Sequence, residues 1–127
     1  MTTPQKFLES FLRDKASVYA QANAHLAPVY LRCFGEPLSH RTVAFMLPDG
    51  AEEMVEQVSE SAGSGMVITR RHFKTADIRT RYHLASVGGG WKITRIDREC
   101  GWCHASGRIS NSPCQECDGE GWCDSAT

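Results

Sequence analysis

Cysteine is the residue type in this sequence whose number and spacing most clearly predict chemistry. Five of the six cysteines fall within residues 100–123. Four of them form two Cys-X-X-Cys pairs, Cys100 with Cys103 and Cys114 with Cys117, and ten residues separate the pairs. Two such pairs can place four sulfur atoms tetrahedrally around Zn²⁺, at about 2.3 Å each. The spacing therefore predicts one closed, structural zinc site with no open position for catalysis.

Two other uses of the same cysteines stay open at this point. Two disulfides would require an oxidising compartment, and a redox-active pair would require an exposed thiol of low pKa. The sequence begins MTTPQKFLES, with acidic and polar residues where a signal peptide needs an apolar core. No stretch approaches the apolar length of a membrane span. We therefore expect a cytoplasmic protein, in which thiolates on a metal are favoured over disulfides.

We also predict the environments of the other cysteines, of His104 and of two tryptophans. Cys123 is expected to be a free thiol, His104 a turn residue, and Cys33 a small core residue far from the others in sequence. Trp102 and Trp122 each lie beside a cysteine, on a segment too short to bury both. We expect them to pack this segment onto the rest of the chain; the alternative is that one is an exposed anchor for a partner protein.

The glycines that follow the cysteines add a family resemblance. The two pairs lie in CGWCHASG and CQECDGEG. This CxxCxGxG pattern resembles the repeat of the cysteine-rich zinc domain of DnaJ-type co-chaperones, over residues 100–121. Gly107, Gly119 and Gly121 match the glycines of that repeat, whereas Ala105 stands at the remaining position and would need a positive φ there.

The resemblance implies one zinc ion, since such domains hold two zincs on four repeats and this chain has two repeats. It does not imply co-chaperone activity, because the chain carries no J-domain with a His-Pro-Asp motif. A two-repeat, one-zinc arrangement is similar to a small bacterial inhibitor, anti-TRAP, which acts by binding another protein.

The first part of the chain is predicted to be mainly helical. Residues 4–22 have apolar residues at steps of three and four, with Thr3 as a cap and Pro4 at the first helical position. Residues 26–34 are a second helical candidate, and residues 41–47 a short strand.

The part that follows is predicted to be an antiparallel β-meander. Turn motifs recur every 10–14 residues, and β-branched and aromatic residues are frequent between them. The expected strands are residues 54–60, 66–73, 76–87 and 91–98, although residues 51–60 also fit a helix. The order predicts an α+β domain over residues 1–98, with helices covering one face of a curved sheet, followed by a zinc module over residues 99–127.

Regular alternation assigns the strand residues to two faces. In residues 76–87, one face carries Ile78, Thr80, Tyr82 and Leu84, and the other carries Arg79, Arg81 and His83. In residues 91–98, one face carries Trp91, Ile93, Arg95 and Asp97, and the other carries Lys92, Thr94 and Ile96. Candidates for general acid–base chemistry are His72, His83, Asp97 and Tyr82.

The helix-first order resembles the nuclear transport factor 2-like, or cystatin-like, superfamily. The resemblance covers residues 4–98, and its best local match is the hairpin TRYHLASVGGGWKITRID. It implies a cone-like fold. It does not imply one activity, because the superfamily includes isomerases, dehydratases, transport receptors and toxin-immunity proteins. With a cysteine-rich tail added, the chain is most similar to the immunity-type members.

Charge is distributed unevenly along the chain. Residues 66–98 carry eight Lys/Arg and two Asp/Glu, or +6, whereas residues 99–127 carry one Arg and five Asp/Glu, or −4. One interpretation is an acidic partner that contacts the basic segment. The alternative is that the basic segment faces the acidic ones within the same fold. The residues expected to contact a partner are Arg71, Arg79, Arg81, His83, Trp102 and Trp122.

These observations favour a non-enzymatic protein that binds another protein, such as an immunity-type inhibitor of a bacterial toxin. The alternative is a small-molecule pocket protein or a lyase/isomerase-type enzyme, with a pocket between helix and sheet near His83 or Asp97. Nucleic-acid binding ranks third, because the pI is about 6.5 and no aromatic stacking platform accompanies the arginines. A homodimer through the open sheet face is another use of the same arginines.

Overall fold

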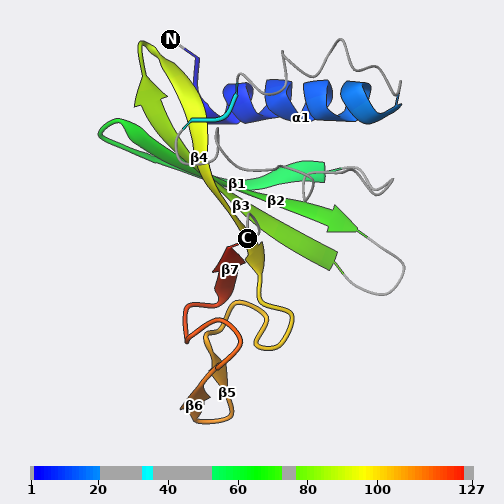
Figure 1. The fold of residues 1–127 in the computed structure, drawn as a ribbon, viewed down its shortest axis with the longest axis vertical. Coiled ribbons are helices and arrows are strands. Elements are labelled where there is room, and N and C mark those ends of the chain that lie inside the picture. The colour runs from blue at the N-terminus through cyan, green and yellow to red at the C-terminus, as the bar shows by residue number, and fades with distance from the viewer. Residues whose placement is uncertain (1, 21–32, 36–52, 73–76, 125–127) are drawn as a thin grey trace.

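The computed structural model describes residues 2–20, 33–35, 53–72 and 77–124. Its elements are helix α1 (Pro4–Ala20) and strands β1 (Glu53–Ser61), β2 (Ser64–His72), β3 (Asp77–Val87), β4 (Gly90–Glu99), β5 (Arg108–Ile109), β6 (Ser112–Pro113) and β7 (Trp122–Asp124). An open antiparallel sheet has the order β1-β2-β3-β4-β7, and β5 pairs with β6. Helix α1 lies across one face of this sheet (Figure 1). The predicted α+β class is confirmed, whereas the cone-like shape stays a prediction.

Helix α1 begins where the sequence predicts it. The backbone N–H of Lys6 donates to the side-chain oxygen of Thr3 at 3.2 Å, which caps the first turn, and Pro4 takes the first helical position. The described helix runs to Ala20, and the last two residues of the predicted helix lie outside the described part of the chain.

The core lies between α1 and the sheet. Leu8 and Phe11 are buried on the helix side, and the Phe11 ring packs edge-on against Phe34 and Tyr82, with centroids 5.6 and 6.0 Å apart. The rest of this cluster consists of Val67, Leu84, Trp91, Ile93 and Ile96. Burial of these side chains is what holds the helix on the sheet, at roughly 1.5–3 kcal/mol for each large one.

Strands β1 to β4 form the predicted meander, and β1 decides the ambiguity over residues 51–60. Residues 53–61 form a strand paired with β2, so the helical alternative is wrong for them. The connections before β2 and before β4 are two-residue turns. Ala62 and Gly63 have φ of 23° and 83°, and Gly88 and Gly89 have φ of 60° and 83°. Positive φ at both turn residues matches the twist of the flanking strands.

A β-bulge interrupts strand β4. His83 pairs with Arg95, but the next residue of β3, Leu84, pairs with Ile93. Thr94 is therefore the extra residue, and side chains beyond it point to the face opposite to the one that regular alternation predicts.

The bulge corrects the predicted faces of β4. Ile96 lies in the core with Trp91 and Ile93, whereas Arg95 and Asp97 lie on the sheet face turned away from the helix. The predicted grouping of Trp91 and Ile93 with Arg95 and Asp97 is wrong, because it assumed a regular strand.

Residues 33–35 lie beside β4. The backbone N–H of Ile93 donates to the carbonyl of Cys33 at 2.7 Å, and that of Gly35 donates to the carbonyl of Ile93 at 2.8 Å. Phe34 thus forms a parallel bridge, and the helix predicted over residues 26–34 is wrong for Cys33 and Phe34. Its other residues and the strand predicted over residues 41–47 lie outside the described part. Cys33 packs against the core, as expected.

The last strand returns the chain from the cysteine-rich segment to the sheet. Trp122 of β7 pairs with Glu99 of β4, and Asp124 pairs with Asp97. The segment between them extends from the end of the sheet, with the β5–β6 hairpin at its tip (Figure 1). The predicted division at residues 98 and 99 stays a prediction, but the sheet itself continues on both sides of it.

Candidate metal centre

The four predicted cysteine ligands come together between β4 and β7. Their Sγ atoms all lie within 4.8 Å of one another, with Cys100 and Cys114 at 3.8 Å and Cys103 and Cys117 at 3.6 Å. Four sulfurs bound tetrahedrally to zinc at about 2.3 Å would be about 3.8 Å apart, whereas a disulfide would bring two of them to about 2.05 Å. The predicted four-cysteine cluster is confirmed, and its cysteines are free thiols.

The two Cys-X-X-Cys segments fold as matching knuckles, which we call knuckle one (residues 100–107) and knuckle two (residues 114–121). In knuckle one the backbone N–H of Ser106 donates to the carbonyl of Cys103 at 3.1 Å, and in knuckle two that of Glu120 donates to the carbonyl of Cys117 at 3.1 Å. The repeat seen in the sequence is therefore also a structural repeat.

The knuckles are joined by reciprocal backbone hydrogen bonds. The N–H of Cys114 donates to the carbonyl of Gly107 at 2.8 Å, and the N–H of Cys100 donates to the carbonyl of Gly121 at 3.0 Å. Each knuckle thus binds the end of the other, which gives the module an approximate twofold arrangement around the cysteines.

This close approach explains the second glycine of each repeat. Gly107 and Gly121 have φ of 78° and 85°, and a Cβ atom there would lie 2.4 Å from the Gly119 carbonyl oxygen or 2.6 Å from that of Ala105. The first glycine position is less restricted. Gly119 and Ala105 occupy it with φ of 78° and 68°, so Ala105 accepts the predicted positive φ at a cost of about 1–2 kcal/mol.

Backbone hydrogen bonds and burial shift the pKa values of two of the cysteines in opposite directions. Backbone N–H groups of Cys103 and Trp102 lower the pKa of Cys100 to about 6, while burial raises the pKa of Cys114 to about 12. The backbone N–H of Gly121 donates to the Sγ of Cys117 at 3.1 Å. A divalent cation bound by the four sulfurs would favour their thiolate forms and compensate their charge.

The donor set fits zinc. Four thiolates are soft ligands, and a tetrahedral arrangement of four sulfurs is typical of zinc or iron. Cys100 and Cys114 are 1% exposed, and Cys103 and Cys117 are 6% exposed. Such a site has no position open to substrate, so a metal here would stabilise the fold rather than catalyse a reaction.

The two tryptophans have different surroundings. Trp122 is 8% exposed, and the guanidinium groups of Arg81 and Arg79 lie 4.7 and 5.6 Å from its ring centroid. It packs the module against the sheet, as expected. Trp102 is 69% exposed, so the expectation that it packs the module onto the rest of the chain is wrong, and its role as an anchor for a partner stays a prediction.

Cys123 and His104 lie close to the cluster. Cys123 is a partly buried free thiol packed against the four cysteines, and its Sγ donates to the Glu116 carbonyl at 3.8 Å. Burial raises the pKa of Cys123. His104 is an exposed turn residue with φ of 52°, as expected.

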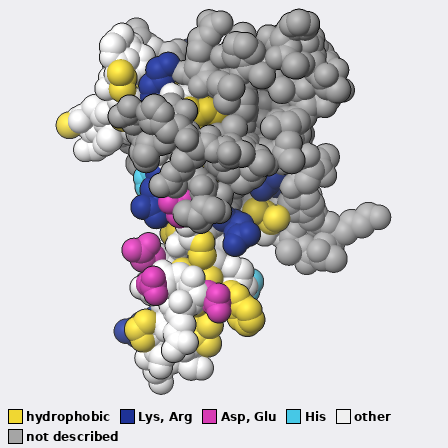
Figure 2. Space-filling view, viewed as in Figure 1, with side chains coloured by type: hydrophobic (Ala, Val, Ile, Leu, Met, Phe, Trp, Pro, Cys, Tyr) yellow, Lys and Arg dark blue, Asp and Glu magenta, His cyan; other side chains and the backbone are white. Residues whose placement is uncertain are grey.

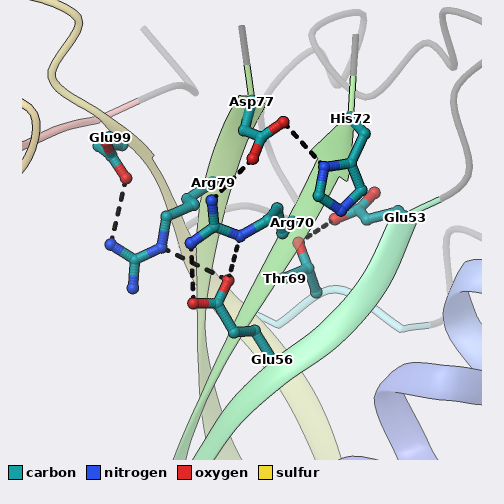
Figure 3. Close-up of polar contacts among 8 residues, drawn as sticks. All are labelled: Glu53, Glu56, Thr69, Arg70, His72, Asp77, Arg79 and Glu99. Carbon is teal, nitrogen blue, oxygen red and sulfur yellow. Dashed lines mark hydrogen bonds and ion pairs between the residues drawn. The ribbon is translucent and has the colours of Figure 1, made fainter.

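On the sheet face away from the helix, the arginines pair with carboxylates of the same chain (Figure 3). Arg70 donates to Glu56 at 2.7 Å, and Arg79 pairs with Glu99 at 3.2 Å and more distantly with Glu56. The hydrogen bond from Arg70 lowers the pKa of Glu56. The interpretation that the basic segment faces acidic residues of its own fold is confirmed for these side chains.

Asp77 extends this group of ion pairs. It accepts hydrogen bonds from Nδ1 of His72 at 2.8 Å and from Arg70 at 2.9 Å, which lower its pKa (Figure 3). The His72 side chain is 67% exposed. His72, one of the acid–base candidates, therefore lies on the surface rather than in a pocket.

Asp97 is the most enclosed charge on the same face. Its side chain is 0% exposed and accepts hydrogen bonds from Arg81 at 2.7 Å, His83 at 2.6 Å and Arg95 at 2.7 Å. Burial alone would raise the pKa of Asp97, but the hydrogen bonds from His83, Arg95 and Arg81 outweigh it and lower the pKa. Two of the acid–base candidates, His83 and Asp97, are therefore in direct contact.

The candidates for a helix-side pocket are divided between the two faces. His83 and Asp97 lie on the side away from α1, so a pocket between helix and sheet would not contain them. Tyr82 faces the helix, and its hydroxyl donates to Glu53, which also accepts from Thr69 at 2.5 Å. Glu53 was missed by sequence reasoning because it stands at the edge of the ambiguous segment.

The predicted partner-binding residues do not form one surface. Arg79, Arg81 and His83 share the open face, and the two arginine side chains are 22% exposed. Arg71 alternates with Arg70 in β2 and lies on the helix side of the sheet. Trp102, in knuckle one, is the most exposed large hydrophobic residue of the described part.

Comparison of the chain with protein-family models, with curated proteins and with solved structures gives no match. The resemblances to DnaJ-type zinc domains and to the nuclear transport factor 2-like superfamily therefore stay expectations. Within the described residues, no helix has the length and apolar character needed to cross a membrane. Arguments about function depend on the site itself.

Proposed function

We propose that this chain is a non-enzymatic protein that binds one structural Zn²⁺ through Cys100, Cys103, Cys114 and Cys117 and uses the zinc module to bind another protein. The zinc would supply most of the folding free energy of a module with almost no apolar core, on the order of 10 kcal/mol. Four thiolate ligands require reducing surroundings, which agrees with the expected cytoplasmic location.

One observation supports protein binding most directly. Knuckle one presents Trp102, 69% exposed, on a backbone that the metal would hold rigid. Exposed tryptophan on a rigid support is typical of interface hot spots, because little side-chain entropy is lost on binding. An acidic partner has less support, since Arg79 and Arg81 already pair with Glu99 and Asp97.

The test is an affinity pull-down from the native host with wild type, Trp102→Ala and Cys114→Ala/Cys117→Ala. We expect one discrete protein to be retained by wild type and lost by the double cysteine variant. If no protein is retained by any form, the binding function is contradicted, and the search would turn to a co-purifying small molecule.

A narrower form of the proposal is an immunity-type inhibitor of a bacterial toxin, based on the two resemblances. Its test is co-expression with toxins encoded beside this protein. Survival of cells that express the chain, and death of cells that express the double cysteine variant, is the expected result. If the chain protects cells from none of the neighbouring toxins, this narrower form alone is contradicted.

The second candidate function is a small-molecule pocket protein or a lyase/isomerase-type enzyme. The observation in its favour is the polar group of Glu53, Tyr82 and Thr69 on the helix side of the sheet. A bound ligand beside Glu53 in an experimental structure would favour this candidate over the binding protein.

A further inference from the structure

A hollow of about 640 Å³ lies where the zinc module meets the end of the sheet. Its walls come from the start of β3, the end of β4, both knuckles and β7, so it exists only when the module is folded against the sheet. A volume of this size suits a few side chains of a bound peptide. Figure 2 shows carboxylate side chains and hydrophobic groups close together on the exposed surface of the module.

Equivalent positions of the two knuckles face this hollow. Trp102 is the third residue of Cys-Gly-Trp-Cys, and Glu116 is the third residue of Cys-Gln-Glu-Cys. Both line the hollow. The approximate twofold arrangement thus places an aromatic ring and a carboxylate at its edge, and these are the two groups that bind a cationic side chain best.

The lining of the hollow also carries a net negative charge. Its lining includes four carboxylates, on Asp77, Glu99, Glu116 and Asp124, and two guanidinium groups, on Arg79 and Arg98. Residues 99–127 carry five Asp/Glu and one Arg in all. Asp77 and Glu99 already pair with Arg70 and Arg79, but the carboxylates still outnumber the guanidinium groups when Arg70 is included, which favours a cation over a phosphate or a carboxylate.

We propose that this hollow binds a lysine or arginine side chain from an extended segment of the partner protein. The cation would lie over the Trp102 ring and pair with Glu116. This inference rests on the proposed function and adds the chemistry of the partner: a basic segment that contacts the module, rather than an acidic surface that contacts the sheet.

The test uses a phage library of random twelve-residue peptides, selected on the zinc-loaded full chain. Peptides retained by wild type are expected to contain lysine or arginine and to be lost on Trp102→Ala. For the best peptide made synthetically, Kd is expected to rise by about 5- to 30-fold in Trp102→Ala and by about 5-fold in Glu116→Gln. Replacing its arginine by citrulline should weaken binding to wild type similarly.

The control variant is Val87→Ala, an exposed hydrophobic position at the end of β3. It should bind the peptide as wild type does, and all variants should keep their zinc and melting temperature. Selection of acidic or uncharged peptides, equal binding to Trp102→Ala, or no enriched peptide at all would overturn the inference.

The pull-down separates this inference from the proposed function. A partner retained equally by wild type and Trp102→Ala but lost with the cysteines would keep protein binding and overturn the hollow as its site. Loss of the partner in Trp102→Ala would support both protein binding by the module and the hollow as the binding site.

Discussion

Gly119 and Gly121 are close neighbours in knuckle two, but a methyl group would meet different surroundings at each. At Gly121 the new Cβ would lie 2.6 Å from the Ala105 carbonyl oxygen, whereas at Gly119 the nearest atom would be a side-chain carbon of Pro113 at 3.4 Å. The corresponding residue of knuckle one is already an alanine, Ala105.

We therefore expect Gly119→Ala to cost about 1 kcal/mol and to leave zinc affinity nearly unchanged. Gly121→Ala should separate the knuckles and lower zinc affinity by a factor of ten or more, measured by competition with a chromophoric chelator. Similar zinc affinity in the two variants would contradict the role of the reciprocal backbone bonds.

Asp97 gives a prediction about pH. Hydrogen bonds from His83, Arg95 and Arg81 depress its pKa in the folded protein, so its stabilisation is present at neutral pH and is lost as pH falls below about 4. Asp97→Asn should destabilise the fold by about 3 kcal/mol at pH 7, measured by urea unfolding, because the partners lose their shared charge.

The difference in unfolding free energy between wild type and Asp97→Asn is the informative quantity. Loss of zinc in acid affects both proteins, so it largely cancels from this difference. The difference should shrink as pH falls below about 4. A difference that grows towards low pH would contradict the assigned direction of the pKa shift.

At the scale of elements, the bulge at Thr94 determines which side of β4 faces the core. Deleting Thr94 would remove the extra residue and restore regular alternation, with Ile96 still in the core and Asp97 still on the open face. We therefore expect the deletion variant still to unfold cooperatively, as judged by thermal unfolding followed by circular dichroism.

The matched control is Thr94→Ala, which keeps the residue count of β4. It removes only the hydrogen bond from the Thr94 hydroxyl to the His83 carbonyl at 3.3 Å, and should cost about 1 kcal/mol. Loss of cooperative folding in the deletion variant alone would contradict the bulge, because only in a regular strand does a one-residue deletion move the following side chains to the opposite face.

The elements differ in how far the sequence predicts them. Turn residues and β-branched runs predicted β1 to β4, because these depend on local preferences. The bulge could not be predicted, since a one-residue irregularity leaves no local pattern around Thr94. Strand β7 was missed for another reason: three residues become a strand only when the knuckles return them to β4.

For the candidate site, the local features of the knuckles were predicted from the sequence, whereas their contacts with the sheet were not. Spacing was enough for the four cysteines, and the resemblance to the CxxCxGxG repeat was enough for the positive φ of Ala105, because the knuckle is a local structure. The different surroundings of Trp102 and Trp122 depend on how the module meets the sheet, which sequence spacing does not determine.

At the scale of the whole molecule, the module and the sheet depend on each other unequally. The core of α1 and the four long strands contains no zinc ligand, whereas the buried hydrophobic cluster of the module consists of the four cysteines. Cys114→Ala/Cys117→Ala should therefore release the metal and disorder residues 100–124, while α1 and β1 to β4 stay folded.

Hydrogen exchange would measure this directly. Backbone amides of β2 and β3 should keep their protection in the double variant, and those of both knuckles and β7 should lose it. Loss of protection throughout the chain would contradict the division into two modules.

The central claim is a closed zinc centre of four thiolates, and X-ray absorption at the zinc edge tests it most directly. Protein purified under reducing conditions should contain one zinc per chain with four sulfur neighbours at about 2.3 Å and no nitrogen or oxygen neighbour. A metal-free protein with oxidised thiols, or zinc with fewer than four sulfurs, would contradict it.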